Sequence, residues 1–551
     1  MKKTFTLFAF TLLAVITIHA QQVQQKWSQC FTDSIGQPYS TDMVTDKNGN
    51  TYFTGYLQET YPNFYNKHFF IVKLNSAGVQ QWVNYYPASD PSDKTKYDIG
   101  KALVLDKDGN IYVAGERYDT VCNICTIQTK YRDMFIIKYD PGGNIQWQYR
   151  FNGPADTYQS PESIAIDKNG FPLIVGNELK YNATTFTYDS KLLILKLRKN
   201  GKRAWIKKDK SLIGSAISSD NNGNVLVAGA FNIQNIYMLQ KLMVTKYSSE
   251  GDSLWTSVFN EINKNGRAYF VGADAAGNIY VNGQTDTVTF YNNPRIITLK
   301  YNSNGNLLWY RKEISNTNTL PHIYGSFSVD AQGRSYVTGS LSPYHVRDSW
   351  VTSKYESNGN LAWSNSYMDA YGGNDKPADL ITDSSGNVYV TGYAANAQYN
   401  YIYTTIKYNA AGVQQWLKTY RYPVPHSNNF ANNISLDGSG NVYVSGASGG
   451  ICTVKYGHPS PAQRNEEEEN TINIFPNPVQ HILHIKLGKS IAGNLNYTIF
   501  NLDGSKFSEG SLNASIPKDD FDIPVQNLRK GIHLCTIQIG DKTYKATFIK
   551  E

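Results

Sequence analysis

Charged residues are scarce in this sequence of 551 residues, at 18% of positions against roughly a quarter in an ordinary globular protein. Intrinsic disorder requires high net charge and few aromatic residues, and coiled coils require many Ala, Glu, Lys and Leu, so neither class fits. The net charge of +7 is too small for a nucleic-acid-binding surface on a chain of this length, and no basic stripe is present. We therefore expect a globular protein without a nucleic-acid partner.

Long hydrophobic runs are missing beyond the N-terminus. Lys2 and Lys3 precede an apolar stretch from Phe5 to Ile18, followed by His19-Ala20-Gln21, which is the arrangement of a secretory signal peptide. The stretch is shorter than the roughly 18 to 20 residues of a transmembrane helix, and no later segment qualifies. We predict a signal peptide at residues 1–20, an exported protein and no transmembrane segment.

Motifs of catalysis and metal binding are also missing. The sequence has no Gly-x-Ser-x-Gly elbow, no Walker loop and no HExxH motif, and its nine histidines show no other ligand spacing. His481-x-x-His484 lies in an alternating, strand-like stretch, so its two side chains are expected on opposite faces at the surface. The sequence therefore predicts no catalytic residue, no metal site and no cofactor.

Tyrosine and asparagine are abundant, with 41 and 53 residues, which indicates a chain rich in strands and turns. A single core stops growing near 250 to 300 residues, so we expect two domains or a ring of repeated units.

Two short strings repeat along the chain. The first, Asp-x-x-Gly, usually continues as Asn-x-Tyr-Val-x-Gly and recurs every 53 to 61 residues, beginning at Asp46, Asp106, Asp167, Asp220, Asp274, Asp330, Asp383 and Asp437. The second places a Lys nine residues before a Trp, in the pairs Lys73/Trp82, Lys138/Trp147, Lys196/Trp205, Lys246/Trp255, Lys300/Trp309, Lys354/Trp363 and Lys407/Trp416. The eighth copy stops at Lys455-Tyr456 without its Trp.

Both strings predict tight hairpins. In Asp437-Gly-Ser-Gly440-Asn441 the Asp side chain opens a type I turn, and Gly takes the left-handed position that closes it. The string only superficially resembles a calcium loop, because the later carboxylates of such loops are missing. Two hairpins per unit give four strands, which we name A to D in chain order.

Four-stranded units repeated at this period predict the blades of a β-propeller. The eighth unit lacks strand D, whereas an isolated D-like strand, Gln25 to Phe31, precedes the first strand A. Joining the two closes a ring and removes free sheet edges. We therefore predict an all-β protein with an eight-bladed propeller at residues 22–457, its ring closed by the N-terminal strand.

Apolar residues at adjacent positions of strand C indicate strands buried on both faces, as between neighbouring blades. Trp350 and Cys452 occupy such positions and are interpreted as core residues. A Gly that closes strand B in every unit, such as Gly55 or Gly229, is typical of close backbone approach or a bulge.

The five cysteines cannot all pair within one chain. Cys122 and Cys125 lie in one long loop, and a local disulfide is expected because one Cys-x-x-Cys supplies only two metal ligands. Cys30 and Cys452 lie on the two strands that close the ring. A bond there is a second hypothesis, opposed by a register expected to be one or two positions off and by the core position of Cys452.

The strings, as in Asp383 to Gly392, resemble the bacterial β-propeller repeats known as SBBP repeats. The resemblance covers about residues 22–457 and implies architecture rather than activity. That family is named for seven blades, whereas eight units are counted here, and the third copy departs with Phe171-Pro172-Leu173. The Lys-to-Trp hairpin is also similar to the tryptophan docking motif of eight-bladed quinoprotein dehydrogenases, but their adjacent Cys-Cys pair is absent.

A Pro-rich, then acidic linker at residues 458–471 separates the propeller from residues 472–551, whose short alternating strands predict a small β-sandwich. Asn473-Ile-Phe-Pro-Asn-Pro478 and Leu528-Arg-Lys-Gly-Ile-His533 resemble the C-terminal sorting domain (type A) of type IX secretion cargo. The resemblance implies the type IX machinery as a partner, passage through the periplasm, and release or attachment at the outer cell surface.

Function is expected where the repeats differ, which is in the long B-to-C and D-to-A connections on one face of the ring. Tyrosines gather there, and their rigid amphipathic rings suit a glycan or protein ligand. The ligand-binding candidates are Tyr61, Tyr65, Tyr118, Tyr181, Tyr188, Tyr344 and Tyr399, with Tyr56, Tyr131, Tyr291 and Tyr401 on the same face. The alternative is that these tyrosines are present only because tyrosine suits exposed strands.

We therefore predict a secreted or surface-attached propeller that acts as a noncatalytic binding or adhesion module. The alternative is an extracellular hydrolase or lyase that uses loop carboxylates, such as Asp156, Glu178 or Asp375.

Overall fold

The computed structural model describes two units, residues 24–457 and residues 458–551. Outside the described residues lie 1–22, 60–65, 86–96, 121–128, 155–156, 183–186, 233–239, 262–263, 288–294, 313–318, 321–324, 344–347, 372–374, 397–399, 423–427, 459–471, 476–478, 502–504 and 540–541. The described residues contain no helix, and hence none that is long and apolar enough to span a membrane.

In the first unit, each sequence repeat forms consecutive antiparallel strands. Repeats 1 to 3 comprise β2 (Gln37–Thr45), β3 (Thr51–Gln58), β4 (Lys67–Leu74) and β5 (Gln80–Tyr85); β6 (Tyr97–Leu105), β7 (Ile111–Thr120), β8 (Thr129–Tyr139) and β9 (Ile145–Phe151); and β10 (Thr157–Ile166), β11 (Pro172–Asn182), β12 (Thr187–Leu197) and β13 (Arg203–Asp209). Single parallel bridges, Lys67 to Tyr97 and Tyr158 to Arg132, join these three repeats into one 12-stranded sheet.

The remaining repeats form separate sheets. Repeat 4 comprises β14 (Leu212–Ser219), β15 (Val225–Asn232), β16 (Gln240–Tyr247) and β17 (Ser253–Phe259), and repeat 5 comprises β18 (Lys264–Ala273), β19 (Ile279–Thr287), β20 (Arg295–Tyr301) and β21 (Leu307–Lys312). Repeat 6 comprises β22 (Thr319–Leu320), β23 (Phe327–Val329), β24 (Ser335–Pro343), β25 (Ser349–Tyr355) and β26 (Leu361–Tyr367), and repeat 7 comprises β27 (Lys376–Thr382), β28 (Val388–Ala395), β29 (Tyr401–Tyr408) and β30 (Gln414–Tyr420). Repeat 8 comprises β31 (Phe430–Leu436), β32 (Val442–Ala447) and β33 (Ile451–Gly457), with β1 (Gln24–Phe31) as its fourth strand.

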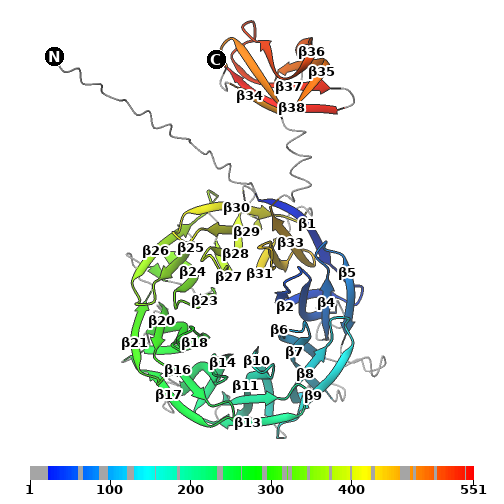
Figure 1. Ribbon diagram of the computed structural model, residues 1–551. Helices are drawn as coiled ribbons and strands as arrows, with labels where there is room; N and C mark the ends of the chain where they lie inside the picture. The colour runs from blue at the N-terminus through cyan, green and yellow to red at the C-terminus, as the bar shows by residue number, and fades with distance from the viewer. Residues whose placement is uncertain are drawn as a thin grey trace, which may run out of the picture. The chain divides into compact units, whose positions relative to one another are not determined.

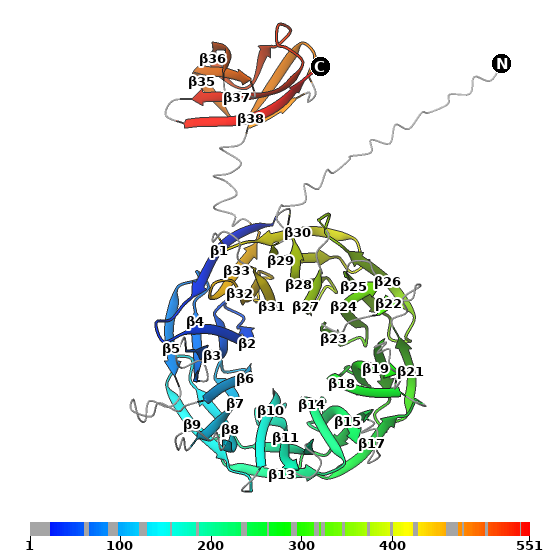
Figure 2. The same ribbon diagram turned by 180° about the vertical axis from the view of Figure 1, so that it is seen from behind.

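The sheets are arranged around a centre, which gives a β-propeller-like all-β fold. In Figures 1 and 2, β2, β6, β10, β14, β18, β23, β27 and β31 lie nearest the centre, and β5, β9, β13, β17, β21, β26, β30 and β1 lie at the rim. Apolar cores fill the space between neighbouring sheets, as where Met134 and Ile136 of repeat 2 meet Leu193 and Leu195 of repeat 3. Trp350 lies in such a core at 1% exposure, as predicted.

The recurring Trp, in most repeats together with the recurring Lys, joins neighbouring repeats at seven described places. The Trp255 indole Nε1 donates to the Ser303 carbonyl at 3.0 Å, and Lys246 Nζ donates to the same oxygen at 3.4 Å. Trp27, Trp82, Trp147, Trp205, Trp309 and Trp363 each donate in the same way, to the carbonyls of Ser76, Pro141, Lys199, Ser249, Ser357 and Ala410. The acceptor is always in the C-to-D hairpin of the following repeat.

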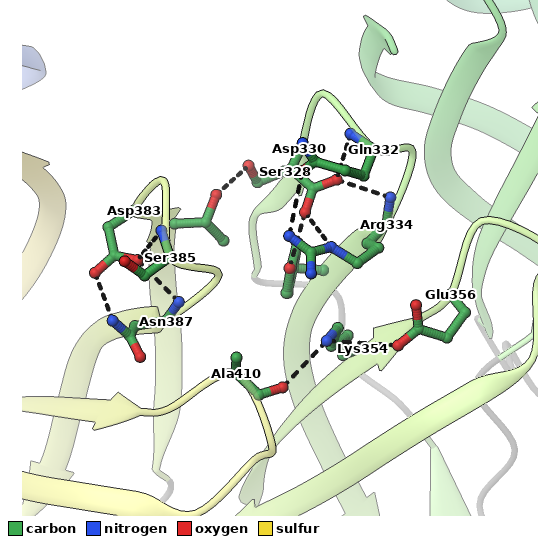
Figure 3. Close-up of polar contacts among 12 residues, drawn as sticks. Ser328, Asp330, Gln332, Arg334, Lys354, Glu356, Asp383, Ser385, Asn387 and Ala410 are labelled. Carbon is green, nitrogen blue, oxygen red and sulfur yellow. Dashed lines mark hydrogen bonds and ion pairs between the residues drawn. The ribbon is translucent and has the colours of Figure 1, made fainter. Parts of the chain in front are cut away.

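Several of the recurring lysines also reach the turn aspartate of their own repeat, namely Lys138, Lys196, Lys246, Lys300 and Lys455. Lys246 Nζ lies 2.9 Å from the Asp220 carboxylate, and that carboxylate accepts the Asn222 and Asn224 backbone N–H groups that form the A-to-B turn. Figure 3 shows the equivalent region of repeats 6 and 7, where Lys354 reaches the Ala410 carbonyl and the Asp330 and Asp383 turns lie nearby. The repeated Asp, Lys and Trp therefore form one connected set of contacts.

Strand β1 closes the ring of sheets by pairing with β33, as predicted. The expectation that Cys30 and Cys452 would be out of register was wrong, because they lie directly opposite each other and form a disulfide. A register shift between Gln25 and Trp27 accounts for the difference. Cys452 is nevertheless fully buried, so it is both a core residue and a disulfide partner.

The second unit is one five-stranded sheet around its own core. Its strands are β34 (Ile472–Phe475), β35 (Ile482–Asn501), β36 (Lys506–Pro524), β37 (Gly531–Ile539) and β38 (Lys542–Lys550). The long strands β35 and β36 pair along most of their lengths with shifts in register, and residues from both halves, such as Leu483 and Ile499, enter the same core. Cys535 is a free thiol buried in that core.

The Cys30–Cys452 disulfide should be found by peptide mapping under non-reducing conditions. The bond spans 422 residues, and loops of 100 residues or more are expected to gain about 5 kcal/mol from reduced chain entropy in the unfolded state. Cys30→Ser should therefore unfold at a lower denaturant concentration than the parent protein, and reducing agent should remove the difference. Recovery of both cysteines as free thiols from the native protein would contradict the assignment.

A pair of glycines isolates the contribution of tryptophan packing. Gly305 has a φ of 86°, and a Cβ there would lie 2.6 Å from the Trp255 ring, whereas Gly277 has a φ of 80° and nothing within 4 Å of such a Cβ. Ala at either position must adopt a left-handed backbone, at about 1 to 2 kcal/mol. Gly305→Ala should cost more than Gly277→Ala in equilibrium unfolding, and equal costs would show that the packing contributes nothing.

Candidate functional site

A bulge in the innermost strands shapes the centre of the ring. In repeat 4 the register shifts between Gly214 and Ala216, so that Ser215 is an extra residue without a partner across the pair. The glycine that closes strand B, Gly229, lies opposite Gly214, and a Cβ on it would overlap the Ile213 carbonyl oxygen. The repeated glycine is thus required by close backbone approach beside a bulge, as the sequence indicated.

The extra residue always stands five positions before the turn aspartate of its repeat. The register identifies Thr41, Lys101, Glu162, Ser215, Tyr269, Ala378 and Asn432, and the same count gives Gly325 in repeat 6. We call this set the bulge residues. Their side chains differ in every repeat, whereas the surrounding framework recurs.

Four of the bulge residues border a cavity of about 740 Å³. The lining residues are Tyr269, Phe270, Asn282, Gln284, Ile296, Gly325, Thr338, Pro377, Ala378, Tyr393, Phe430, Asn432 and Ala447. They come from repeats 5 to 8, and most lie near the end of an A strand, B strand or C strand that adjoins a B-to-C or D-to-A connection. The cavity is therefore on the side of the ring where the long, variable connections predicted a functional site.

Aromatic rings form one wall of the cavity. The ring centroids of Tyr393 and Phe430 lie 4.8 Å apart with an interplanar angle of 83°, and Tyr401 packs on both at 5.1 and 5.4 Å. Tyr269, on the opposite repeat of the lining set, is 38% exposed. Edge-to-face packing of this kind holds Tyr393 and Phe430 rigidly in place.

Amide side chains complete the lining and support it. Asn282 donates to the Ile297 carbonyl and to Thr298 Oγ1, which fixes its orientation. Behind the aromatic wall the fully buried Asn429 donates to the Tyr401 carbonyl and accepts from the Tyr422 backbone N–H. The wall is thus held by hydrogen bonds as well as by packing.

Two of the other four bulge residues, Lys101 and Glu162, are charged. Lys101 lies 3.6 Å from the buried Glu116, which also lies 3.9 Å from Arg132. Burial raises the pKa of Glu162, while the charges of Lys101 and Arg267 act to lower it. The centre of the ring therefore has a charged part in repeats 2, 3 and 5 and an aromatic part in repeats 5 to 8.

Two aspartates brace the innermost strands against each other. Asp42 accepts the Leu103 N–H at 2.8 Å, and Asp379, at the same position of its repeat, accepts the Ile434 N–H at 3.0 Å. Both remain partly accessible, yet the protein packed around them raises the pKa of Asp42 to about 7 and that of Asp379 to about 6. Asp379 follows Pro377 and Ala378, so this bond joins two strands that line the cavity.

Most of the predicted tyrosines cannot be placed at the cavity. Tyr181 is exposed at the end of β11, and Tyr118 and Tyr188 lie in β7 and β12, where their side chains are outside the described structure. Tyr61, Tyr65, Tyr344 and Tyr399 fall outside the described residues, as do Cys122 and Cys125. None of these residues is among those that line the described cavity.

Two of the three carboxylates named for the alternative hydrolase or lyase, Glu178 and Asp375, have structural partners. Glu178 is 3% exposed and pairs with Lys208 at 2.5 Å and Lys191 at 3.7 Å. Asp375 is fully buried and accepts N–H groups from Asp369 and Ala395. Asp156 lies outside the described residues, and neither of the other two lines the cavity.

Sequence reasoning pointed to the loops and missed the cavity residues. Tyr269, Tyr393 and Phe430 lie within strands, where an aromatic residue looks like part of the scaffold. The count of five residues before each turn aspartate was the available signal, since it selects the one position where every repeat carries a different side chain.

Comparison with known proteins identifies the C-terminal unit. Residues 473–551 match the family described as the secretion system C-terminal sorting domain. This domain points to handling by the type IX secretion machinery and to secretion or export to the cell surface. No curated protein matches the chain.

Similar solved structures include a β-propeller domain and a polysaccharide lyase. The β-propeller domain of the Trilobed protease from Pyrococcus furiosus is 10% identical, with 65% of this chain and 94% of that chain covered and a TM-score of 0.34. A polysaccharide lyase of family PL25, an ulvan lyase, is 13% identical, with 63% and 90% covered and a TM-score of 0.38. A protein of unknown function from Dyadobacter fermentans is 10% identical, with 79% and 99% covered and a TM-score of 0.35. These scores are too low to carry a functional argument.

The buried Asp375 should make stability depend on pH. Burial, together with the hydrogen-bonded Asp369 carboxyl, raises the pKa of Asp375 to about 8, whereas an unfolded aspartate titrates near 3.9. The folded protein therefore binds more protons than the unfolded chain between about pH 4 and pH 8, and this group lowers stability as the pH rises through that window.

Asp375→Asn keeps an acceptor for the Ala395 N–H and removes the titration. As the pH rises from 5 to 9, the free energy of unfolding measured with denaturant should fall less for the variant than for the parent protein. An unchanged pH dependence would show that Asp375 is ionised throughout. Asp140→Asn, at an exposed hairpin whose carboxyl pKa is lowered by hydrogen bonds to Asn144, is the control and should not flatten the profile in that window.

Proposed function

We propose that the protein is a secreted or cell-surface β-propeller that binds glycan chains in its central cavity without cleaving them. The supporting observation is the lining of the cavity. Aromatic rings and amides converge there, and no carboxylate, lysine, arginine or histidine is among the described lining residues.

This lining suits a carbohydrate. Exposed ring faces such as that of Tyr269 pack against the apolar faces of sugar rings, and amides such as those of Gln284 and Asn432 donate to and accept from hydroxyl groups. The volume of about 740 Å³ is within the range of small-molecule sites and would hold a few sugar units. A protein ligand that inserts a short loop is a second possibility for the same surface.

The proposed ring has eight blades. Eight turn aspartates, the sheet formed by β31, β32, β33 and β1, and the Lys and Trp contacts between successive repeats support this count. The SBBP type of the repeats remains part of the proposal. For the C-terminal unit we propose a small β-sandwich, since both halves of β35 and β36 contribute to one core.

The proposed route begins with the signal peptide at residues 1–20 and passes through the periplasm. The sorting domain at residues 473–551 supports export across the outer membrane from there. The propeller at residues 22–457 and the linker at residues 458–471 would then reach the outside of the cell.

The alternative function is a hydrolase or lyase. Glu162 favours it, because this side chain is accessible to solvent while the protein packed around it raises the pKa of its carboxyl. A glycosidase requires a second carboxylate opposite the first, and the described cavity lining provides none. Binding without turnover is therefore the stronger proposal.

Retention on a panel of immobilised polysaccharides tests the proposal. Tyr269→Ala and Phe430→Ala should each weaken binding by roughly tenfold or more, which corresponds to about 1.4 kcal/mol for the loss of one ring contact. Tyr310→Ala is the matched control, since Tyr310 is 44% exposed on β21 of the same repeat and does not line the cavity.

Two outcomes would contradict the proposal. One is retention that neither cavity variant reduces while the variants remain folded by thermal unfolding. The other is release of reducing ends or unsaturated sugars from the bound polysaccharide, which would support the hydrolase or lyase.

A further inference from the structure

One arginine stands where the aromatic part of the centre meets the charged part. Arg267 lies in β18, two residues before Tyr269, and its guanidinium carbon is 5.9 Å from the centroid of the Tyr269 ring. Tyr269 lines the cavity, so a ligand that contacts its ring comes within reach of the guanidinium.

The neighbouring repeat holds this guanidinium in place. Arg267 Nε donates to Ser215 Oγ at 2.8 Å, and Ser215 is the bulge residue of repeat 4. One edge of the guanidinium is therefore occupied, and the two Nη groups are the remaining donors. An arginine fixed by one bond loses less entropy when it binds a ligand than a freely rotating one.

The charges around Arg267 determine which ligand groups it can bind. Lys101, on the bulge of repeat 2, adds a second positive charge, although it is paired with Glu116. Glu162, in repeat 3, is an acidic residue, and the positive charges of Lys101 and Arg267 both act on its carboxyl. The described cavity lining itself contributes no charge, and Arg267 brings a positive charge against one of its residues, Tyr269.

We propose that the glycan bound in the cavity is an acidic one, whose carboxylate or sulfate group is held by Arg267 while its sugar ring packs on Tyr269. This inference rests on the proposed function and deepens it by naming the ligand class. A planar carboxylate or a sulfate matches the fork of donors that a guanidinium presents. The partly enclosed position strengthens the attraction relative to bulk water.

The test compares matched polysaccharides in solution by calorimetry. The probes are polygalacturonate and chondroitin sulfate, each beside its carboxyl-reduced counterpart, with desulfated chondroitin as a third arm. The parent protein should bind polygalacturonate at least tenfold more tightly than its neutral carboxyl-reduced form, or chondroitin sulfate at least tenfold more tightly than the carboxyl-reduced or desulfated form that lacks the recognised group, and its affinity should fall as salt is added. The reduced and desulfated arms show which anionic group is recognised.

Variants assign the preference to Arg267. Arg267→Gln should weaken binding of the acidic polymer at least tenfold and leave binding of the neutral polymer unchanged. Arg267→Lys should retain part of the preference, because charge remains while the fork is lost. Arg203→Gln, which removes an exposed arginine of β13 that does not line the cavity, is the control and should change neither affinity.

Two further variants distinguish a binding role from a structural one. Glu162→Gln should strengthen binding of the acidic polymer, because it removes a like charge near the bound anion. Ser215→Ala should weaken it moderately, because the guanidinium loses the bond that positions it. Both effects should disappear with the neutral polymer, which a general loss of folding would not produce.

Failure of this inference and failure of the proposed function give different results. Equal affinity for acidic and neutral polymers, reduced by Tyr269→Ala but not by Arg267→Gln, would overturn the acidic ligand and leave glycan binding intact. Absence of binding to every polymer in the panel would count against both.

Discussion

The structure depends on a backbone carbonyl in the C-to-D hairpin of repeats 1 to 7, which accepts an indole N–H from the neighbouring repeat and, in most of these repeats, a lysine ammonium group as well. Trp255 and Lys246 both donate to the Ser303 oxygen, and Lys246 at the same time neutralises the Asp220 carboxylate that forms its own A-to-B turn. Turn formation and docking between repeats are thus coupled through one lysine. Since the acceptor is a main-chain atom, the acceptor residue can be Ser, Pro, Lys or Ala without loss of the contact.

The same framework separates support from specificity. Glycines such as Gly229 allow strands A and B to approach closely, and the bulge beside them leaves one residue per repeat unconstrained by pairing. The bulge residues include lysine, glutamate, tyrosine and glycine, which no packing rule would place at one equivalent position. A ring of this kind can change its ligand by changing these positions while its sheets stay the same.

The sequence was sufficient for the architecture because each repeated string encodes a local event. Asp-x-x-Gly specifies a turn, the Lys and Trp specify a docking contact, and the missing eighth strand D specified where β1 would pair. The site required knowledge of register, which depends on how two strands meet. Tyr269 is the unpaired bulge residue of β18 and lines the cavity, and Arg267 lies two residues before it.

Register also explains the error at the disulfide. In the other repeats the Lys and Trp of strands C and D lie directly opposite each other, as Lys73 and Trp82 do. Applying that pairing to Lys455 and Trp27 brings Cys30 and Cys452 together, three residues further along. The information was present in the sequence, but it lay in the comparison of repeats and not in the spacing of the cysteines.

Pairing of Gln24 with Gly457 places the two ends of the first unit side by side. A protein held at a surface through its C-terminal unit would receive mechanical load at Gly457, the end of β33. That strand is hydrogen-bonded on both sides, to β1 and to β32, and is linked covalently to β1 through Cys452. Pulling on the tether would therefore act on a doubly held, cross-linked strand, and the repeats could not be unravelled one by one from a free end.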